Sequence, residues 1–304
     1  MSDVNPSGPA NDRPVPAPAA GQPPPVFDVD LGARTHPGKL RETNDDHFHV
    51  VRFGRYLRTE LSSLAPGEVA EEPDRPGYGF VVADGVGGRA AGEVASRLAI
   101  SLLIDCALQT PDWILGHEDD LLSQVMVRSA RRFQKVNEAV LKKAQSRPGL
   151  QGMGTTMSLA MTLGDDLLVT HVGDSRVYLL RQGQLRRLTQ DHAVGREPAP
   201  STRVSAARIR RVLTHAIGIP ETGGEPDLHH YKLADGDRLL LCTDGLTDLV
   251  RDDRIAAELG GRPSAAAACQ ALVDLALDRG GRDNVTAVVA AYRLSNAAAS
   301  RPAG

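Results

Sequence analysis

The chain has 304 residues and a formal net charge of −3, with 41% hydrophobic and 24% charged residues. This composition is that of a globular protein and excludes a chain that is disordered throughout. The slight acidic excess argues against nucleic-acid binding through a basic surface. The apolar runs are far shorter than the ~18 residues of a membrane span, and the three cysteines form neither a metal motif nor an even set for disulfides. We therefore expect a cytoplasmic globular protein with no membrane span and no nucleic-acid partner.

Proline, alanine and glycine dominate the first 25 residues, which include the run PVPAPAAGQPPP. Such a segment buries too little apolar surface to offset the entropy lost on ordering. We expect residues 1–25 to form a disordered tail with polyproline II character and residues 295–304 to be a frayed C-terminus. The remaining residues, 26–294, suit a single large catalytic domain better than two smaller ones.

In the first half of the chain, apolar periodicity predicts strands followed by two helices. A strand-like stretch begins at Val26 and is broken by the turn-rich residues 34–39, and a clear strand follows at 46–53. Residues 61–78 are rich in Pro, Gly and Glu and predict a surface excursion. A short strand at 78–83 leads into a glycine turn at 84–88. Apolar residues at helical spacing then predict helices over 91–108 and 118–144.

The second half returns to strands, predicted at 155–163, 166–172, 176–181 and 184–188 with hairpin turns between them. Residues 191–227 are rich in Pro, Gly and Arg and predict a loop with a little helix. A buried strand is expected at 238–243, a helix at 262–279 with Ser264 as its N-cap, and a last strand at 284–294. This order of elements predicts an α+β layered domain with antiparallel meanders.

Aspartates recur where the predicted strands meet turns. They are Asp45, Asp46, Asp84, Asp174, Asp244 and Asp283. If these strand ends lie side by side, the carboxylates converge, and burying them without compensation is costly. A divalent cation relieves that repulsion, and oxygen ligands without a Cys or His cluster favour Mg²⁺ or Mn²⁺ over zinc. Neighbouring glycines would let backbone carbonyls approach the ion.

Asp-Gly pairs are also ordinary turn formers, and a single such pair is more often a turn than a ligand. The residues by themselves therefore leave both interpretations open.

Six segments in chain order narrow the choice: RETNDD (41–46), VVADGVGG (81–88), MGTTMS (153–158), VGDSRVYLLRQGQLRRLTQDH (172–192), LLLCTDGLTDLV (239–250) and GGRDNVTAVV (280–289). Together they resemble the motifs of the metal-dependent protein phosphatases of type 2C, most closely the bacterial branch. The resemblance covers about residues 26 to 294. It implies a β-sandwich of two antiparallel sheets flanked by helix pairs, with two Mn²⁺ or Mg²⁺ ions at one end. The implied reaction removes phosphate from phosphoserine and phosphothreonine in proteins and so reverses a Ser/Thr kinase.

The resemblance also implies roles for single residues. Asp84 would bridge both metals, with the Gly85 carbonyl on one of them. Asp244 and Asp283 would bind the other ion. Asp45 stands where the family usually has Glu and would act through metal-bound water.

Two further positions match the family. Asp174, together with Asp244, resembles the pair that holds a weaker third metal in bacterial members. Arg41 matches the arginine that grips the substrate phosphate, a task that suits a planar guanidinium. The alternative for Arg41 is an exposed turn residue.

Two departures from the family concern the residue after Asp-Gly and the flap. Val86 occupies the place where many eukaryotic relatives have a histidine that acts as a general acid. The flap, residues 191–216, lacks the usual pattern and carries a basic run of Arg203, Arg208, Arg210 and Arg211. This run would contact a phosphopeptide or an acidic partner, or it would be a solvated helix face.

The histidines predict no zinc site, because His47 and His49 share a strand face without a third ligand at a suitable spacing. His171 lies in an apolar strand and is expected in the core. The leading hypothesis is thus a protein Ser/Thr phosphatase, and the alternative is an inactive family member that binds phosphorylated partners. Retention of Asp84, Asp244 and Asp283 argues against the inactive form. A phosphatase docked to a kinase assembly is a third possibility that the sequence does not separate from the first.

Overall fold

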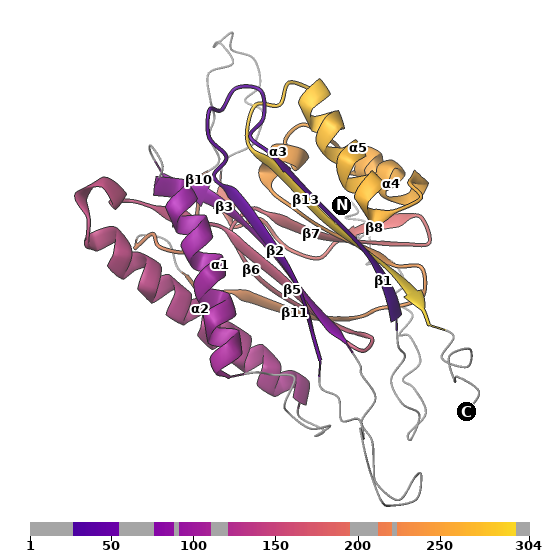
Figure 1. Cartoon of the computed structure of the whole chain (residues 1–304), viewed down its shortest axis with the longest axis horizontal. Coiled ribbons are helices and arrows are strands. Elements are labelled where there is room, and N and C mark those ends of the chain that lie inside the picture. Colours follow the sequence, from indigo (N-terminus) through magenta and orange to yellow (C-terminus); the bar gives the residue numbers. More distant parts are fainter. Residues whose placement is uncertain are drawn as a thin grey trace, which may run out of the picture.

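The computed structural model describes residues 27–54, 76–87, 91–110, 121–194, 212–220 and 224–295. In this part of the chain, two antiparallel sheets pack face to face and helices cover both outer faces (Figure 1). The predicted α+β sandwich with flanking helix pairs is confirmed. The predicted tail over residues 1–25, most of the excursion at 61–78 and the basic run of the flap lie outside the described residues.

One sheet has six strands. Five of them follow the order β11 (Asp227–Lys232), β6 (Asp166–Val172), β5 (Met157–Leu163), β3 (Gly77–Val86) and β2 (Asp46–Phe53), and the two-residue β4 (Gly154–Thr155) pairs with the end of β3. The register of β2 and β3 places Asp46 directly opposite Asp84. Pairing between these two strands therefore brings two of the acidic motifs together.

The other sheet has five strands, in the order β1 (Phe27–His36), β13 (Val285–Leu294), β12 (Arg238–Cys242), β7 (Arg176–Arg181) and β8 (Gln184–Arg187). β1 and β13 pair along their whole length, from Phe27 opposite Leu294 to His36 opposite Val285. A separate two-stranded ladder joins β9 (Ala193–Val194) to β10 (Val212–Leu213).

Apolar side chains fill the space between the two sheets. Phe80 and Val82 of β3 meet Leu239, Leu241 and Tyr292 of the opposite sheet in one buried cluster. Successive residues of a strand point to opposite faces, so the remaining apolar residues of the same strands face the helices. The sandwich therefore has three apolar layers, one between the sheets and one under each helix pair.

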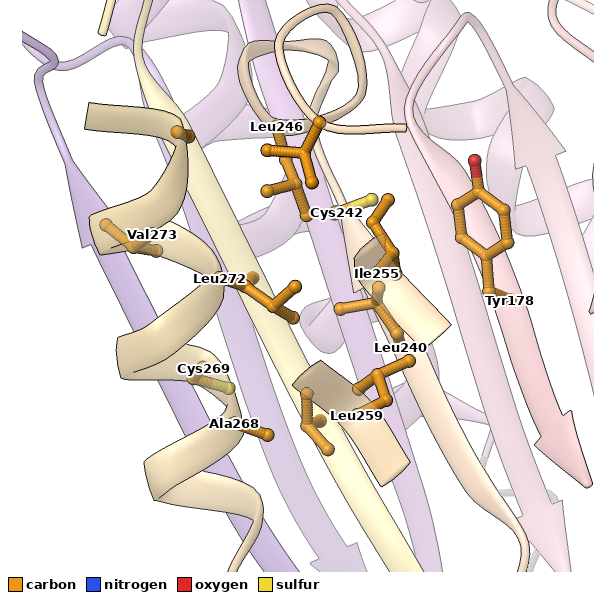
Figure 2. Packing of buried hydrophobic residues seen from close by; sticks show 14 of the residues in the cluster. Tyr178, Leu240, Cys242, Leu246, Ile255, Leu259, Ala268, Cys269, Leu272 and Val273 are labelled. Atoms are coloured by element: carbon orange, nitrogen blue, oxygen red, sulfur yellow. The ribbon is translucent and has the colours of Figure 1, made fainter. Parts of the chain in front are cut away.

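Each sheet is covered by helices on its outer face. α1 (Ala91–Gln109) and α2 (Leu121–Gln145) pack on the six-stranded sheet, and α4 (Asp252–Gly261) and α5 (Ala265–Asp278) pack on the five-stranded sheet (Figure 1). In Figure 2, Ile255 and Leu259 of α4 and Leu272 of α5 lie over Leu240 of β12. The predicted N-cap of α5 is confirmed, because the Ser264 hydroxyl accepts a hydrogen bond from Ala267 N–H at 3.1 Å.

The structure differs from the sequence-based elements in several places. The predicted strand 155–163 is interrupted at Thr156, between β4 and β5. Within residues 191–227, where a loop with a little helix was predicted, the described part contains β9, β10 and the start of β11, and residues 195–211 lie outside the described residues. The one-turn α3 (Asp244–Thr247), the 3-10 helix η2 (Pro148–Leu150) and all of α4 were not predicted. None of the described helices combines the length and apolar character needed to cross a bilayer.

Candidate metal centre

The ends of four neighbouring strands bring the predicted aspartates to one end of the sandwich. Asp84 lies near the end of β3. Asp244 is the first residue of α3, just after the end of β12. Asp283 stands just before β13, which pairs with β12, and Asp174 lies in the turn between β6 and β7. β7 also pairs with β12. Sheet topology thus gathers residues that are far apart in the sequence.

The electrostatics confirm that these carboxyl groups share one environment. Burial raises the pKa of Asp84 well above its ordinary value, and repulsion from Asp46, Asp244, Asp174 and Asp283 adds to the increase. For Asp244 burial is again the largest cause, followed by repulsion from Asp174, Asp248, Asp283 and Asp46. Partly buried acids that repel one another in this way are a favourable place for a cation.

Asp46 is the most deeply buried of the cluster, with 3% of its surface exposed. Its Oδ2 accepts hydrogen bonds from the hydroxyls of Thr243 and Thr286, both at 2.8 Å. Its Oδ1 has no hydrogen-bond partner among the described residues. Burial raises the pKa of Asp46 to about 7. Asp46 belongs to one sheet, whereas Thr286 lies in β13 and Thr243 directly follows β12 of the other sheet. This carboxyl group therefore ties the two sheets together beside the candidate site.

The glycines of the motifs allow their loops to approach one another closely. A Cβ atom on Gly85 would lie 2.2 Å from the carbonyl oxygen of Gly92, and one on Gly245 would lie 1.9 Å from that of Asn284. Gly85 N–H also donates to the Asp45 carbonyl at 3.1 Å. Any larger residue at these positions would push apart the loops that carry the aspartates.

Two threonines of the MGTTMS segment hold the backbone of Asp84. The Asp84 N–H donates to Thr156 Oγ1 at 3.0 Å, and the Asp84 carbonyl accepts from Thr156 N–H at 2.9 Å and from Thr155 Oγ1 at 2.8 Å. Both threonines are buried. At the break between β4 and β5, Thr155 and Thr156 therefore form hydrogen bonds with the backbone of Asp84.

Asn284 performs a similar task for the RETNDD loop. Its Oδ1 accepts from Asp45 N–H at 2.8 Å, and its Nδ2 donates to the carbonyls of Pro37 and Thr43 at 2.9 and 2.8 Å. We predicted no role for Asn284 from the sequence, although its position next to Asp283 in the GGRDN motif could have indicated one. Through it, the GGRDN motif sets the position of Asp45.

Arg41 lies at the exposed edge of the cluster. Its Nη2 is 2.7 Å from Asp283 Oδ2, and the two side chains are 45% and 42% exposed. The hydrogen bond to Asp283 is the largest influence on Arg41 and raises its pKa, and attraction to Asp84 and Asp45 adds to this. The guanidinium is thus beside the carboxylates and accessible to an incoming anion.

The donor set is made of carboxylate and carbonyl oxygens, which suits a hard divalent cation. In the described ranges, no three His, Cys, Asp or Glu side chains are close enough together to hold a metal ion as they stand. Burial and the neighbouring carboxylates raise the pKa values of Asp84 and Asp244, so a bound cation would stabilise their charged forms. By its chemistry the cluster fits Mg²⁺ or Mn²⁺.

The predicted histidine roles can also be compared with the structure. His171 is fully buried, which confirms its place in the core. His47 Nδ1 contacts Ser96 Oγ at 3.0 Å, a hydrogen bond that accounts for its position on β2 without a metal.

Comparisons with known proteins agree with this arrangement. A family model described as protein phosphatase 2C matches residues 71–278. The serine/threonine protein phosphatase PstP of Mycobacterium tuberculosis is 38% identical over 218 residues, which are 69% of this chain and 40% of that protein. The chain therefore spans less than half the length of this relative. The serine/threonine phosphatase stp of Listeria innocua is 30% identical over 266 residues, covering 86% of this chain and 95% of the relative.

Solved structures show the same fold. The catalytic domain of PstP in complex with two manganese ions superposes with a TM-score of 0.64 at 30% identity, covering 88% of this chain and 100% of that chain. The S. agalactiae serine/threonine phosphatase superposes with a TM-score of 0.67 at 26% identity and the same coverage. From the motifs, the sandwich and these matches, the chain belongs to the protein phosphatase 2C family.

Proposed function

We propose that this chain hydrolyses phosphoserine and phosphothreonine in proteins with the help of Mn²⁺ or Mg²⁺ and so reverses a Ser/Thr kinase. The observation that supports the proposal is the convergence of Asp84, Asp244, Asp174 and Asp283, where burial, and after it repulsion between the carboxylates, raises the pKa values of Asp84 and Asp244. Membership of the family and the manganese-bound PstP domain support it.

In this proposal Asp84 would help to hold both of two ions, and the Gly85 carbonyl would bind one of them. Asp244 and Asp283 bind the other ion, and Asp45 acts through water. Asp174 and Asp244 would form a weaker third site, and Asp174 is the carboxylate that repels Asp244 most strongly. Their oxygens supply only hard ligands.

Bound cations would lower the pKa of a water molecule and neutralise the phosphoryl oxygens, so that water attacks phosphorus in line without a phosphoenzyme. Arg41 orients the phosphate, because a guanidinium matches two phosphate oxygens and its present partner, Asp283, is exposed enough to exchange. Val86 has no proton to give to the leaving serine oxygen, so solvent is expected to provide it.

The alternative is an inactive member of the family that binds phosphorylated proteins. Hydrolysis of an aryl phosphate with and without Mn²⁺ separates the two, with binding of a phosphopeptide measured by fluorescence anisotropy in the same protein. Mn²⁺-dependent turnover that disappears in Arg41→Ala supports the phosphatase. Phosphopeptide binding without turnover at any Mn²⁺ concentration would favour the inactive form.

The partners in this proposal are phosphorylated proteins and a cognate Ser/Thr kinase. The cytoplasmic location and docking to a kinase assembly stay predictions. Comparing phosphoproteins in a deletion strain with those in a strain carrying Asp84→Ala would identify substrates, because both strains should accumulate the same phosphosites.

A further inference from the structure

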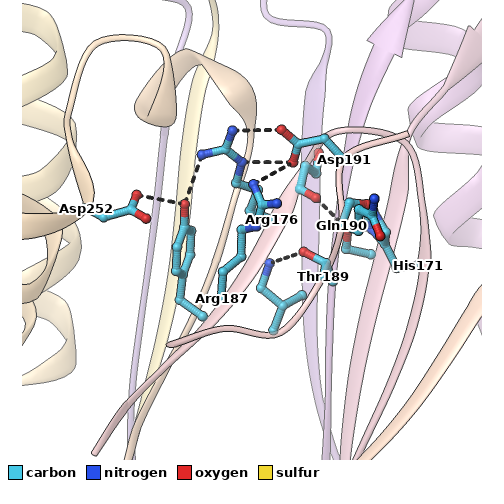
Figure 3. A network of polar contacts seen from close by, with 11 residues as sticks. His171, Arg176, Arg187, Thr189, Gln190, Asp191 and Asp252 are labelled. Atoms are coloured by element: carbon cyan, nitrogen blue, oxygen red, sulfur yellow. Dashed lines mark hydrogen bonds and ion pairs between the residues drawn. The ribbon is translucent and has the colours of Figure 1, made fainter. Parts of the chain in front are cut away.

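The segment Gln190, Asp191 and His192 runs beside the turn that carries Asp174, and each of its residues binds that turn or its flanking strands. His171 Nε2 is 3.1 Å from the Gln190 carbonyl, and Arg176 donates two hydrogen bonds to Asp191, at 2.9 and 2.7 Å (Figure 3). His192 N–H donates to the Gly173 carbonyl at 2.8 Å. A second contact returns from Gly173 N–H to His192 Nδ1 at 3.3 Å.

The Gly173 turn has little freedom between these contacts. Gly173 has φ of +112°, and a Cβ atom there would lie 2.5 Å from Cβ of Thr156. Thr156 is also the residue whose hydroxyl accepts from Asp84 N–H. His192 on one side and Thr156 on the other therefore fix the backbone from which Asp174, only 5% exposed, projects.

The two hydrogen bonds of the His192 ring require one tautomer, with the hydrogen on Nε2. Its Nε2 is 3.0 Å from Asp227 Oδ2, and a carboxylate accepts, so Nε2 carries the hydrogen. Gly173 N–H can only donate, so Nδ1 must keep its lone pair. Both contacts fit the same neutral tautomer, and a ring turned the other way would lose both.

The surroundings of the ring support this orientation. His171 and His215 pack against it, with ring centroids 5.0 and 4.6 Å away. His171 is held in the same tautomer, with Nε2–H on the Gln190 carbonyl and Nδ1 accepting from Ser158 Oγ at 2.8 Å. Burial lowers the pKa of His171 to about 4, so the neighbour of His192 is uncharged at neutral pH.

We propose that His192 is a positioning residue for Asp174. Through Gly173 it sets the direction of the Asp174 carboxylate and therefore the affinity of the weaker third cation site. This inference rests on the proposed function, because it assigns Asp174 to a cation. Residues that orient metal ligands commonly change metal affinity by about 10- to 100-fold when they are replaced.

The test uses the full chain and two replacements of His192, each of which keeps the hydrogen bond made by one of the two ring nitrogens. Asn places a side-chain oxygen where Nδ1 was, so His192→Asn keeps an acceptor for Gly173 N–H and loses Asp227. Gln places its amide where Nε2 was, so His192→Gln keeps Asp227 and loses Gly173. His230→Gln is the matched control, because Nε2 of His230 on β11 pairs with Oδ1 of Asp166 on β6 at 2.6 Å. Among the described residues, no contact joins that pair to Gly173.

Mn²⁺ binding is followed by isothermal titration and by electron paramagnetic resonance of free Mn²⁺, with melting temperature as the check on folding. We expect His192→Gln to weaken the weakest site by at least about tenfold, the direction also expected for Asp174→Ala, while the tighter sites are unchanged. His192→Asn should stay within about threefold of wild type, as should His230→Gln.

Two results would overturn the inference. One is a weakest site of wild-type affinity in His192→Gln, and the other is equal weakening in the Asn and Gln variants, which would indicate a merely structural role. Wild-type protein that binds no Mn²⁺ would instead overturn the proposed function, and the inference with it.

Discussion

Three Asp-Gly pairs occur in the chain, and the structure uses them in two different ways. In Asp235-Gly236, between β11 and β12, the glycine has φ of +80° and open space around it. The Asp235 carboxylate accepts from Leu294 N–H at 2.8 Å. This is an ordinary turn, in which glycine supplies a backbone conformation and aspartate accepts a hydrogen bond from the end of β13.

Asp84-Gly85 and Asp244-Gly245 differ from it in both residues. Neither glycine has a positive φ, and each lies against the backbone of another element, Gly85 against Gly92 of α1 and Gly245 against Asn284. Both aspartates are surrounded by other carboxylates that raise their pKa values. The same dipeptide thus forms a turn in one region and permits close approach in the other, and only the surroundings distinguish them.

The largest expected difference between the two regions is in catalysis. Under the proposed function, Asp84→Ala should lower the rate of Mn²⁺-dependent aryl phosphate hydrolysis by at least ~10³-fold, typical of removing a principal electrostatic group. The variant should still fold, because it removes one charge from a repulsive cluster. Circular dichroism and steady-state rates on both proteins provide the measurement. A variant that retains more than about a tenth of the wild-type rate would contradict the two-metal assignment.

The glycines provide a second contrast, in stability. In Gly245→Ala the new methyl group would overlap the Asn284 carbonyl, so a loss of about 1–3 kcal/mol or more is expected, as in overpacked cores. Gly236→Ala meets no atom and should cost only the strain of a left-handed residue, roughly 1–2 kcal/mol. Urea unfolding of the two variants compares them. Equal losses would mean that the loop at Asn284 moves aside easily.

The buried carboxyl group of Asp46 also predicts a pH dependence of stability. In metal-free protein, the pKa of Asp46 is about 7, against an ordinary value of 3.8. The folded state therefore keeps a proton that the unfolded chain loses between these values. Stability contributed by Asp46 is fully present below about pH 4 and is lost as the pH rises through about 7, by up to about 1.4 kcal/mol per pH unit.

Asp46→Asn should remove this pH-dependent contribution, because an amide does not titrate in this range. The amide oxygen can still accept from Thr243 and Thr286. The free energy of unfolding, measured from pH 4 to pH 8 with a chelator present, should then fall less steeply than in wild type. Parallel curves for the two proteins would show that Asp46 does not carry a proton in this range.

The smallest effect is expected at the turn aspartate. Asp235→Ala loses one exposed hydrogen bond to Leu294 N–H, which is worth about 0.5–1.5 kcal/mol. Its catalytic rate per folded molecule should equal that of wild type. A large loss of rate in Asp235→Ala would remove the distinction between the two kinds of Asp-Gly pair.

Much of the fold was predictable because long strands carry clear apolar patterns. The ranges 46–53, 166–172 and 176–181 match β2, β6 and β7. α4 escaped prediction because it buries only Ile255 and Leu259, and β11 because its residues are mostly polar and only partly buried. Short elements at the edge of a sheet depend on tertiary contacts that periodicity does not record.

The candidate site was predictable as a set of aspartates but not as a network. In the sequence, Asp45 and Asp46 are adjacent acids, and nothing in their order tells which one points between the sheets. Pairing with β3 decides this by placing Asp46 opposite Asp84. The supporting contacts of Asn284 and His192 join residues that are distant in sequence, so they required the fold.

The pairing of β1 with β13 has a consequence during synthesis of the protein. Thr35 and Thr286, whose hydroxyls are 2.8 Å apart, are separated by 251 residues in the chain. On the ribosome β1 has no partner until β13 emerges, and such long-range pairing is intrinsically slow to form. Asn284, which holds the RETNDD loop, emerges at the same late stage. A nascent chain therefore acquires its complete cluster of aspartates only after nearly all of the domain has been translated.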